Sequence, residues 1–100
     1  MVGASCVDTV VYYSLVIIFF MNTPIYLDVR TPEEFAMGHY PGAYNYDVNL
    51  IAAGNIPNIA KDAILKIYCR SGARAQVAQT LLEQAGFINT ENIGGLVDSI

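Results

Sequence analysis

A cysteine and two arginines lie within six residues of one another, in the segment CRSGAR at residues 69–74. Cys69 ends an apolar run, AILKIYC, and a helix-like segment follows the loop. A cysteine thiolate is a nucleophile that neighbouring cations and the backbone N–H groups of a helix N-terminus stabilise. Arg70 and Arg74 supply the cations, and Gly72 lets the backbone turn closely. The pattern predicts a reactive thiolate in an anion-binding loop, rather than the buried apolar residue that a free cysteine often is.

The elements on either side must position this loop. Residues 63–69 are rich in β-branched and aromatic side chains and predict a buried strand. Residues 73–86 predict a helix with an apolar stripe and Gly86 at its end. Ligands of open parallel sheets bind beyond the carboxyl ends of the strands, where Cys69 would lie. The backbone N–H groups expected to surround its sulfur belong to Arg70, Ser71, Gly72, Ala73 and Arg74.

The rest of the chain predicts an alternation of strands and helices. Residues 25–29 predict a short buried strand. Thr31, Pro32 and Glu34 then form a capping-box pattern at the start of a short helix. Such an alternation indicates an α/β fold with a mainly parallel sheet. The remaining elements expected are an extended piece at 43–46, helical turns at 47–53 and a last strand near 90–93.

The composition limits the classes of function. The chain has 100 residues, which suits one domain, and its formal net charge is −4 with only five lysines and arginines. A nucleic-acid-binding domain normally carries a basic surface, so this class is not expected. Cys6 and Cys69 make no disulfide framework, and the single His39 with scattered acids makes no metal-ligand cluster. We therefore expect neither a metal nor another cofactor.

Residues 1–21 are interpreted as a segment apart from a domain at residues 22–100. The twelve residues from Val10 to Met21 are almost wholly apolar, and Arg30 is the first basic residue. A membrane-spanning helix needs about 20 residues. Three interpretations remain open: a signal or anchor that associates with a membrane, a buried strand or helix of the domain, or a mis-assigned start with Met21 as the true one. The first is preferred and predicts a periplasmic location; the alternative is a cytoplasmic one.

Three blocks of the sequence resemble the rhodanese-like sulfurtransferases of the small single-domain type. They read YLDVRTPEEF, GHYPGA, and IYCRSGARAQVAQTLLEQAGF with ENIGGL, and together they span roughly residues 24–97. Their order along the chain makes the match specific. The resemblance implies a three-layer α/β/α rhodanese-like domain with a mainly parallel sheet. It also implies that Cys69 carries a sulfur atom as a persulfide.

The chemistry that the resemblance implies is a double displacement. The Cys69 thiolate takes the outer sulfur of thiosulfate or a similar donor, sulfite leaves, and the sulfur passes to cyanide or a thiol. The loop would bind the anionic donor, with Arg70 and Arg74 attracting it. Asp28 and Arg30, in the DVR block, would lie around the loop. For both of them a plain ion pair and turn cap is the preferred interpretation.

Two other classes of function remain open. A rhodanese-like domain can be a sulfur carrier or regulatory module without catalysis, although the intact cysteine loop favours an enzyme. Related phosphatases carry arginine six positions after the cysteine, where this chain has Ala75, and Arg74 comes one position earlier. The shorter loop suits a sulfur atom better than a phosphoryl group. A phosphatase or an arsenate reductase is therefore the weaker alternative.

Overall fold

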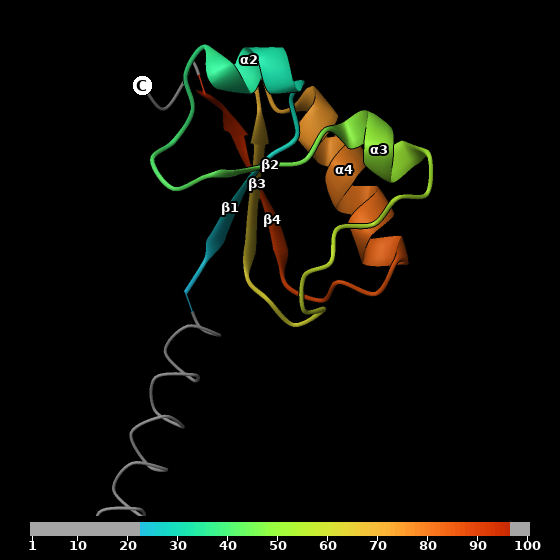
Figure 1. Cartoon of the computed structure of the whole chain (residues 1–100). Helices are drawn as coiled ribbons and strands as arrows, with labels where there is room; N and C mark the ends of the chain where they lie inside the picture. The colour runs from blue at the N-terminus through green and yellow to red at the C-terminus, as the bar shows by residue number, and fades with distance from the viewer. Residues whose placement is uncertain (1–22, 97–100) are drawn as a thin grey trace, which may run out of the picture.

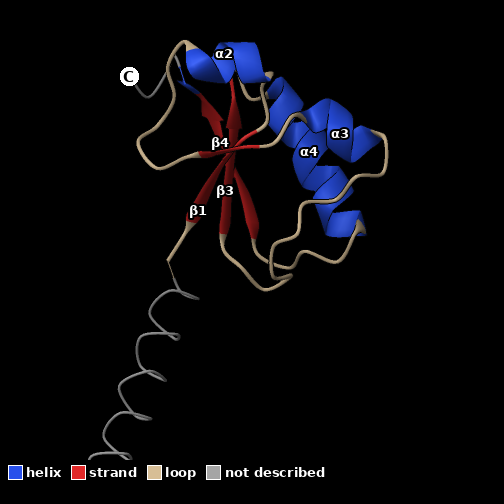
Figure 2. Cartoon of the chain, viewed as in Figure 1, coloured by secondary structure: helices blue, strands red, loops and turns tan. Residues whose placement is uncertain are grey.

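The computed structural model describes residues 23–96 (Figures 1 and 2). The apolar N-terminal segment, for which three interpretations are open, lies outside the described residues. Within residues 23–96, no helix has the length and apolar content that crossing a membrane requires. The predicted elements are confirmed, with ends that differ by two residues at most. They are β1 (Ile25–Asp28), α2 (Pro32–Ala36), β2 (Tyr44–Asn45), α3 (Val48–Ala52), β3 (Leu65–Cys69), α4 (Ala73–Gln84) and β4 (Thr90–Gly95).

The four strands form one parallel sheet in the order β2-β1-β3-β4. β1 pairs with β2 on one side and with β3 on the other, and β3 also pairs with β4. The prediction of an α/β fold with a mainly parallel sheet is therefore confirmed. Because all strands run in the same direction, their carboxyl ends meet at one edge. The register places Asp28 opposite Tyr68, so β1 and β3 end side by side.

The hydrophobic core lies between the sheet and the helices α3 and α4, which lie together on one side of it (Figure 2). Alternate residues of a strand point to the same face, so Leu65, Ile67 and Cys69 all join this core from β3. Helix α4 buries the apolar stripe that its sequence predicts, and Gly86 follows its end with a positive φ of 107°. The remaining core residues are Leu27, Val29, Val48, Ile51, Ala75, Ala78, Leu82 and Phe87.

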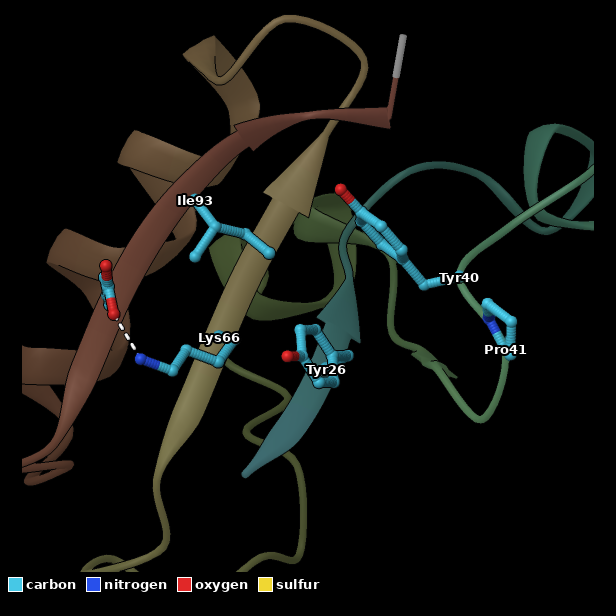
Figure 3. Close-up of a pocket in the computed structure, with 6 residues that line it drawn as sticks. Tyr26, Tyr40, Pro41, Lys66 and Ile93 are labelled. Carbon is cyan, nitrogen blue, oxygen red and sulfur yellow. Dashed lines mark hydrogen bonds and ion pairs between the residues drawn. The ribbon is translucent and has the colours of Figure 1, made fainter. Parts of the chain in front are cut away.

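The opposite face of the sheet carries a hollow (Figure 3). Tyr26, Lys66 and Ile93 extend toward it from β1, β3 and β4. Tyr40 and Pro41 close it from the loop after α2, while α2 itself lies beyond the carboxyl ends of the strands (Figure 1). Helices α3 and α4 therefore cover one face of the sheet, and the loop after α2 borders the hollow on the other.

Helix α2 begins with the capping box that the sequence predicts. The Thr31 side chain accepts a hydrogen bond from the backbone N–H of Glu34, and the Glu34 carboxylate accepts one from the backbone N–H of Thr31. Pro32 occupies the first helical turn, where its missing N–H has no cost. Such a box satisfies two of the free N–H groups at a helix start. It also fixes the Glu34 carboxylate in place.

Candidate active site

Cys69 is the last residue of β3, and the structure places it at the carboxyl edge of the sheet. The residue is buried, with 1% of its surface exposed. Its Sγ accepts hydrogen bonds from the backbone N–H groups of Gly72 at 2.9 Å and Ala75 at 3.4 Å. Both groups belong to the loop and first turn of α4, whose N-terminus carries partial positive charge. The arrangement stabilises an anion on the sulfur.

The set of N–H donors differs from the one predicted. Gly72, in the predicted set, donates to the sulfur, and so does Ala75, which lies outside it. The reason is geometric, because the first turn of a helix directs its free N–H groups back along the axis. The other loop residues Arg70, Ser71 and Ala73 are exposed at the surface, and the two hydrogen bonds to Sγ found within residues 23–96 come from Gly72 and Ala75.

The loop backbone is held from the side of β4. Gly72 has a positive φ of 96°, a conformation that glycine adopts readily, and it precedes α4 without a side-chain cap. The Asn92 amide donates to the Gly72 carbonyl at 3.0 Å, and a shift in the β3–β4 register places Gly95 beside Cys69. A Cβ atom on Gly95 would collide with the Arg70 carbonyl. Apart from the two glycines of the block ENIGGL, no local sequence pattern predicted these contacts.

The two loop arginines have different surroundings. Arg70 is exposed and has no ion-pair partner within residues 23–96. Arg74 donates from its two terminal nitrogens to the two carboxylate oxygens of Glu34, at 2.7 and 3.0 Å. These hydrogen bonds raise the pKa of Arg74, and the charge of Cys69 nearby acts in the same direction. Arg74 is therefore already paired with a carboxylate.

Glu34 is the residue of this site that sequence reasoning missed. Its capping-box position identified a local role in α2, and nothing in the sequence linked it to an arginine 40 residues away. The hydrogen bond from Arg74, followed by those from Thr31, lowers the pKa of Glu34 to about 2. The carboxylate is therefore ionised throughout the neutral range.

Asp28 and Arg30 form a buried pair at the end of β1. The Arg30 side chain donates to both Asp28 carboxylate oxygens, at distances from 2.7 to 3.2 Å, and the Arg30 backbone N–H donates to Asp28 at 2.9 Å. Arg30 also donates to the Gly38 carbonyl at 2.7 Å. Burial is the main cause that raises the pKa of Tyr68, which lies under the guanidinium, to about 12. These contacts describe an ion pair that holds the turn after β1.

The surface beside the loop is hollowed between α4 and β4, with a lining that includes Ser71, Gly72, Gln76, Asn92 and Gly94. The hollow in Figure 3 lies on the sheet face and has no cysteine in its lining. Within the described part of the chain, no group of three or more histidine, cysteine or acidic side chains could hold a metal ion. Cys69 and its loop are therefore the centre of the candidate site.

A comparison with family models identifies the class to which this fold and loop belong. The model of the rhodanese-like domain matches residues 20–98. The chain therefore belongs to the rhodanese-like domain family.

Its relatives include enzymes with named sulfur-transfer activities. Thiosulfate sulfurtransferase PspE of Escherichia coli K12 is 33% identical over 76 residues, covering 73% of this chain and 71% of that protein. A sulfurtransferase of Allochromatium vinosum is 40% identical over 72 residues, covering 71% of this chain and 66% of that protein.

A solved structure, a rhodanese with anions from E. coli, matches with a TM-score of 0.65 and 32% identity, covering 76% of this chain and 91% of that one. These similarities support sulfur transfer as the class of activity.

Proposed function

We propose that this protein is a thiosulfate sulfurtransferase that moves sulfane sulfur through a persulfide on Cys69. The observation that carries the proposal is the pair of backbone N–H groups, from Gly72 and Ala75, directed at the Cys69 sulfur from the start of α4. They favour an anion at this position, and both the resting thiolate and the loaded persulfide are anions. The relatives named as sulfurtransferases support the same chemistry.

The first half-reaction loads the enzyme. The Cys69 thiolate attacks the outer sulfur of thiosulfate, a new S–S bond forms, and the original S–S bond breaks. Sulfite leaves with the electron pair of that bond, so a monoanion and a dianion give a persulfide anion and the sulfite dianion. The exposed side of the loop, with Arg70, Ser71 and Ala73, faces the incoming donor. Arg70 attracts the dianion because no carboxylate within residues 23–96 neutralises it.

The second half-reaction regenerates the thiolate. A thiophilic acceptor, cyanide or a thiolate, attacks the outer sulfur of the persulfide and takes it away. The electron pair of the broken S–S bond returns to the Cys69 sulfur. Because the same two N–H groups bind the thiolate and the persulfide, the loop does not have to rearrange between the two steps.

Intact-mass measurement after thiosulfate treatment tests this proposal. We expect the mass to rise by one sulfur atom and to return to its starting value after cyanide is added. Cys69→Ser should abolish the adduct, because serine cannot carry a persulfide, and Cys6→Ser should retain it. An adduct that survives in Cys69→Ser would sink the assignment to this cysteine.

Phosphatase activity, the alternative function, is disfavoured by the loop. A phosphoryl group needs donors around its equatorial oxygens, and Arg74, which lies nearest the position of the phosphatase arginine, is bound to Glu34. We therefore expect no measurable hydrolysis of an aryl phosphate. Turnover of that substrate that is lost in Cys69→Ser would favour the phosphatase instead.

We also propose that residues 1–21 are separable from the domain and act as a signal or an anchor. Strand β1 begins at Ile25, and the family match begins at residue 20. A protein that starts at Met21 should fold and load sulfur at the rate of the full chain. If circular dichroism shows that the shortened protein is unfolded, the apolar segment belongs to the core.

A further inference from the structure

The pair between Glu34 and Arg74 joins α2 to the loop that carries Cys69. The guanidinium donates two parallel hydrogen bonds to the carboxylate, at 2.7 and 3.0 Å. A bidentate arrangement of this kind fixes the orientation of the guanidinium as well as its charge. Two of the five N–H donors of Arg74 are committed to it. The remaining N–H donors of Arg74 have directions that this fixed guanidinium orientation sets.

The carboxylate is itself held in place from the other side. One oxygen of Glu34 accepts hydrogen bonds from the hydroxyl of Thr31 at 3.1 Å and from its backbone N–H at 3.2 Å. The capping box therefore makes the carboxylate a fixed anchor rather than a mobile surface group. Arg74 cannot turn toward the mouth of the loop without leaving this anchor.

The pairing changes the charge that a donor meets. Arg70 and Arg74 would together present two positive charges to an approaching anion. The negative charge of Glu34 cancels one of these positive charges. The side chain of Glu34 is 30% exposed, and that of Arg74 is 36% exposed. At such half-exposed positions charges are only partly screened by solvent, so the cancelled charge changes the attraction of a dianion more than that of a monoanion.

We propose that Glu34 is a positioning residue that sets the donor-charge preference of the loop by tying Arg74 away from the donor. The proposal rests on the sulfur-transfer function proposed above. With Arg74 tied, the loop accepts monoanionic donors, such as aryl thiosulfonates, more readily relative to thiosulfate than two free arginines would allow. Glu34 acts through Arg74 and does not touch the donor.

The test compares the rate constant for loading Cys69 with thiosulfate, a dianion, and with benzenethiosulfonate, a monoanion. Glu34→Gln removes the charge and keeps the capping box, which accepts glutamine at this position. We expect the thiosulfate-to-thiosulfonate ratio of rate constants to rise about fivefold, the order of effect of one unit charge at a partly screened site. Glu33→Gln is the matched control, because Glu33 is an exposed acid on the same helix, whereas Arg74 pairs with Glu34. It should leave the ratio unchanged within about twofold.

A second background shows whether Glu34 acts through Arg74. In Arg74→Gln, the added change Glu34→Gln should alter the ratio by less than about twofold, because no guanidinium remains to be released. An equal change in both backgrounds would mean that Glu34 acts on the donor by its own charge, and it would overturn the proposal. An equal fall for both donors in Glu34→Gln, with an unchanged ratio, would identify a merely structural role and would also overturn it. If the unaltered protein is not loaded by either donor, the sulfur-transfer function itself fails.

Discussion

Two arginine–carboxylate pairs stand at the carboxyl ends of the strands, and they differ in what surrounds them. In both pairs the shortest N–O distance is 2.7 Å. The side chains of Arg30 and Asp28 are 8% and 0% exposed, whereas those of Arg74 and Glu34 are 36% and 30% exposed. The first pair joins residues two apart in sequence, and the second joins residues 40 apart. The same contact therefore supports the fold in one place and remains open to solvent and ligands in the other.

The two pairs should therefore contribute different amounts to the free energy of unfolding. Removing one partner of a buried pair leaves an uncompensated charge in the interior, which costs about 3–5 kcal/mol. A half-exposed pair contributes only about 0–1 kcal/mol, because solvent and salt screen it. We expect changes in the first pair to affect mainly stability and changes in the second to affect mainly donor selection.

Asp28→Ala should have the largest effect on stability. Within residues 23–96 it leaves the buried Arg30 guanidinium with the Gly38 carbonyl as its one hydrogen-bond acceptor and with no counter-charge, so the free energy of unfolding should fall by about 3–5 kcal/mol. Urea unfolding followed by circular dichroism measures the loss. Asp62→Ala, at an exposed position, is the control and should change stability by less than about 0.5 kcal/mol. A loss below about 1 kcal/mol in Asp28→Ala would remove the distinction between the two pairs.

The same conservative change in each pair tests the comparison more finely. Lysine keeps the charge and loses the planar fork of arginine. Arg30→Lys should cost about 1–3 kcal/mol, because bonds to Asp28 and Gly38 are lost in the interior. Arg74→Lys should cost less than about 1 kcal/mol. Equal losses in parallel urea titrations would contradict the comparison.

The pH dependence of the exposed pair should be the smallest effect. The pKa of Glu34 is lowered to about 2 in the folded protein, from an ordinary value of 4.5. The unfolded chain therefore binds more protons between these values, so the stabilisation is complete above pH 4.5 and is lost as the pH falls toward 2. The stability difference between the unaltered protein and Glu34→Gln should narrow over this range in urea titrations. A difference that stays constant from pH 6 to pH 2.5 would exclude this titration as its source.

Local signals were sufficient to predict most of the fold. The capping box of α2 and the apolar stripe of α4 are both written within a few neighbouring residues, and both were found where expected. Cys69 was also predicted to lie at the strand-to-helix junction, where the structure places it. These features depend on short-range periodicity and on the chemistry of helix ends.

The contacts that join distant segments could not be predicted in this way. Arg74 was expected to face the donor freely, and its pairing with Glu34 depends on how α2 is placed beyond the sheet. Asn92 supports the loop only because of the β3–β4 register. Such positions follow from the assembled tertiary structure, which the local pattern of a single sequence does not reveal.

The close approach of Gly95 to the Arg70 carbonyl limits how this protein can diversify. Strand β4 packs directly against the loop. The space that a side chain at Gly95 would need is already filled by the loop backbone. We expect a longer loop, of the kind that could surround a larger oxyanion, to press against β4 at this point. A change of chemistry by insertion therefore requires a second, simultaneous change in β4. Single mutational steps toward a new substrate should be more accessible through the side chains that rim the loop than through its length.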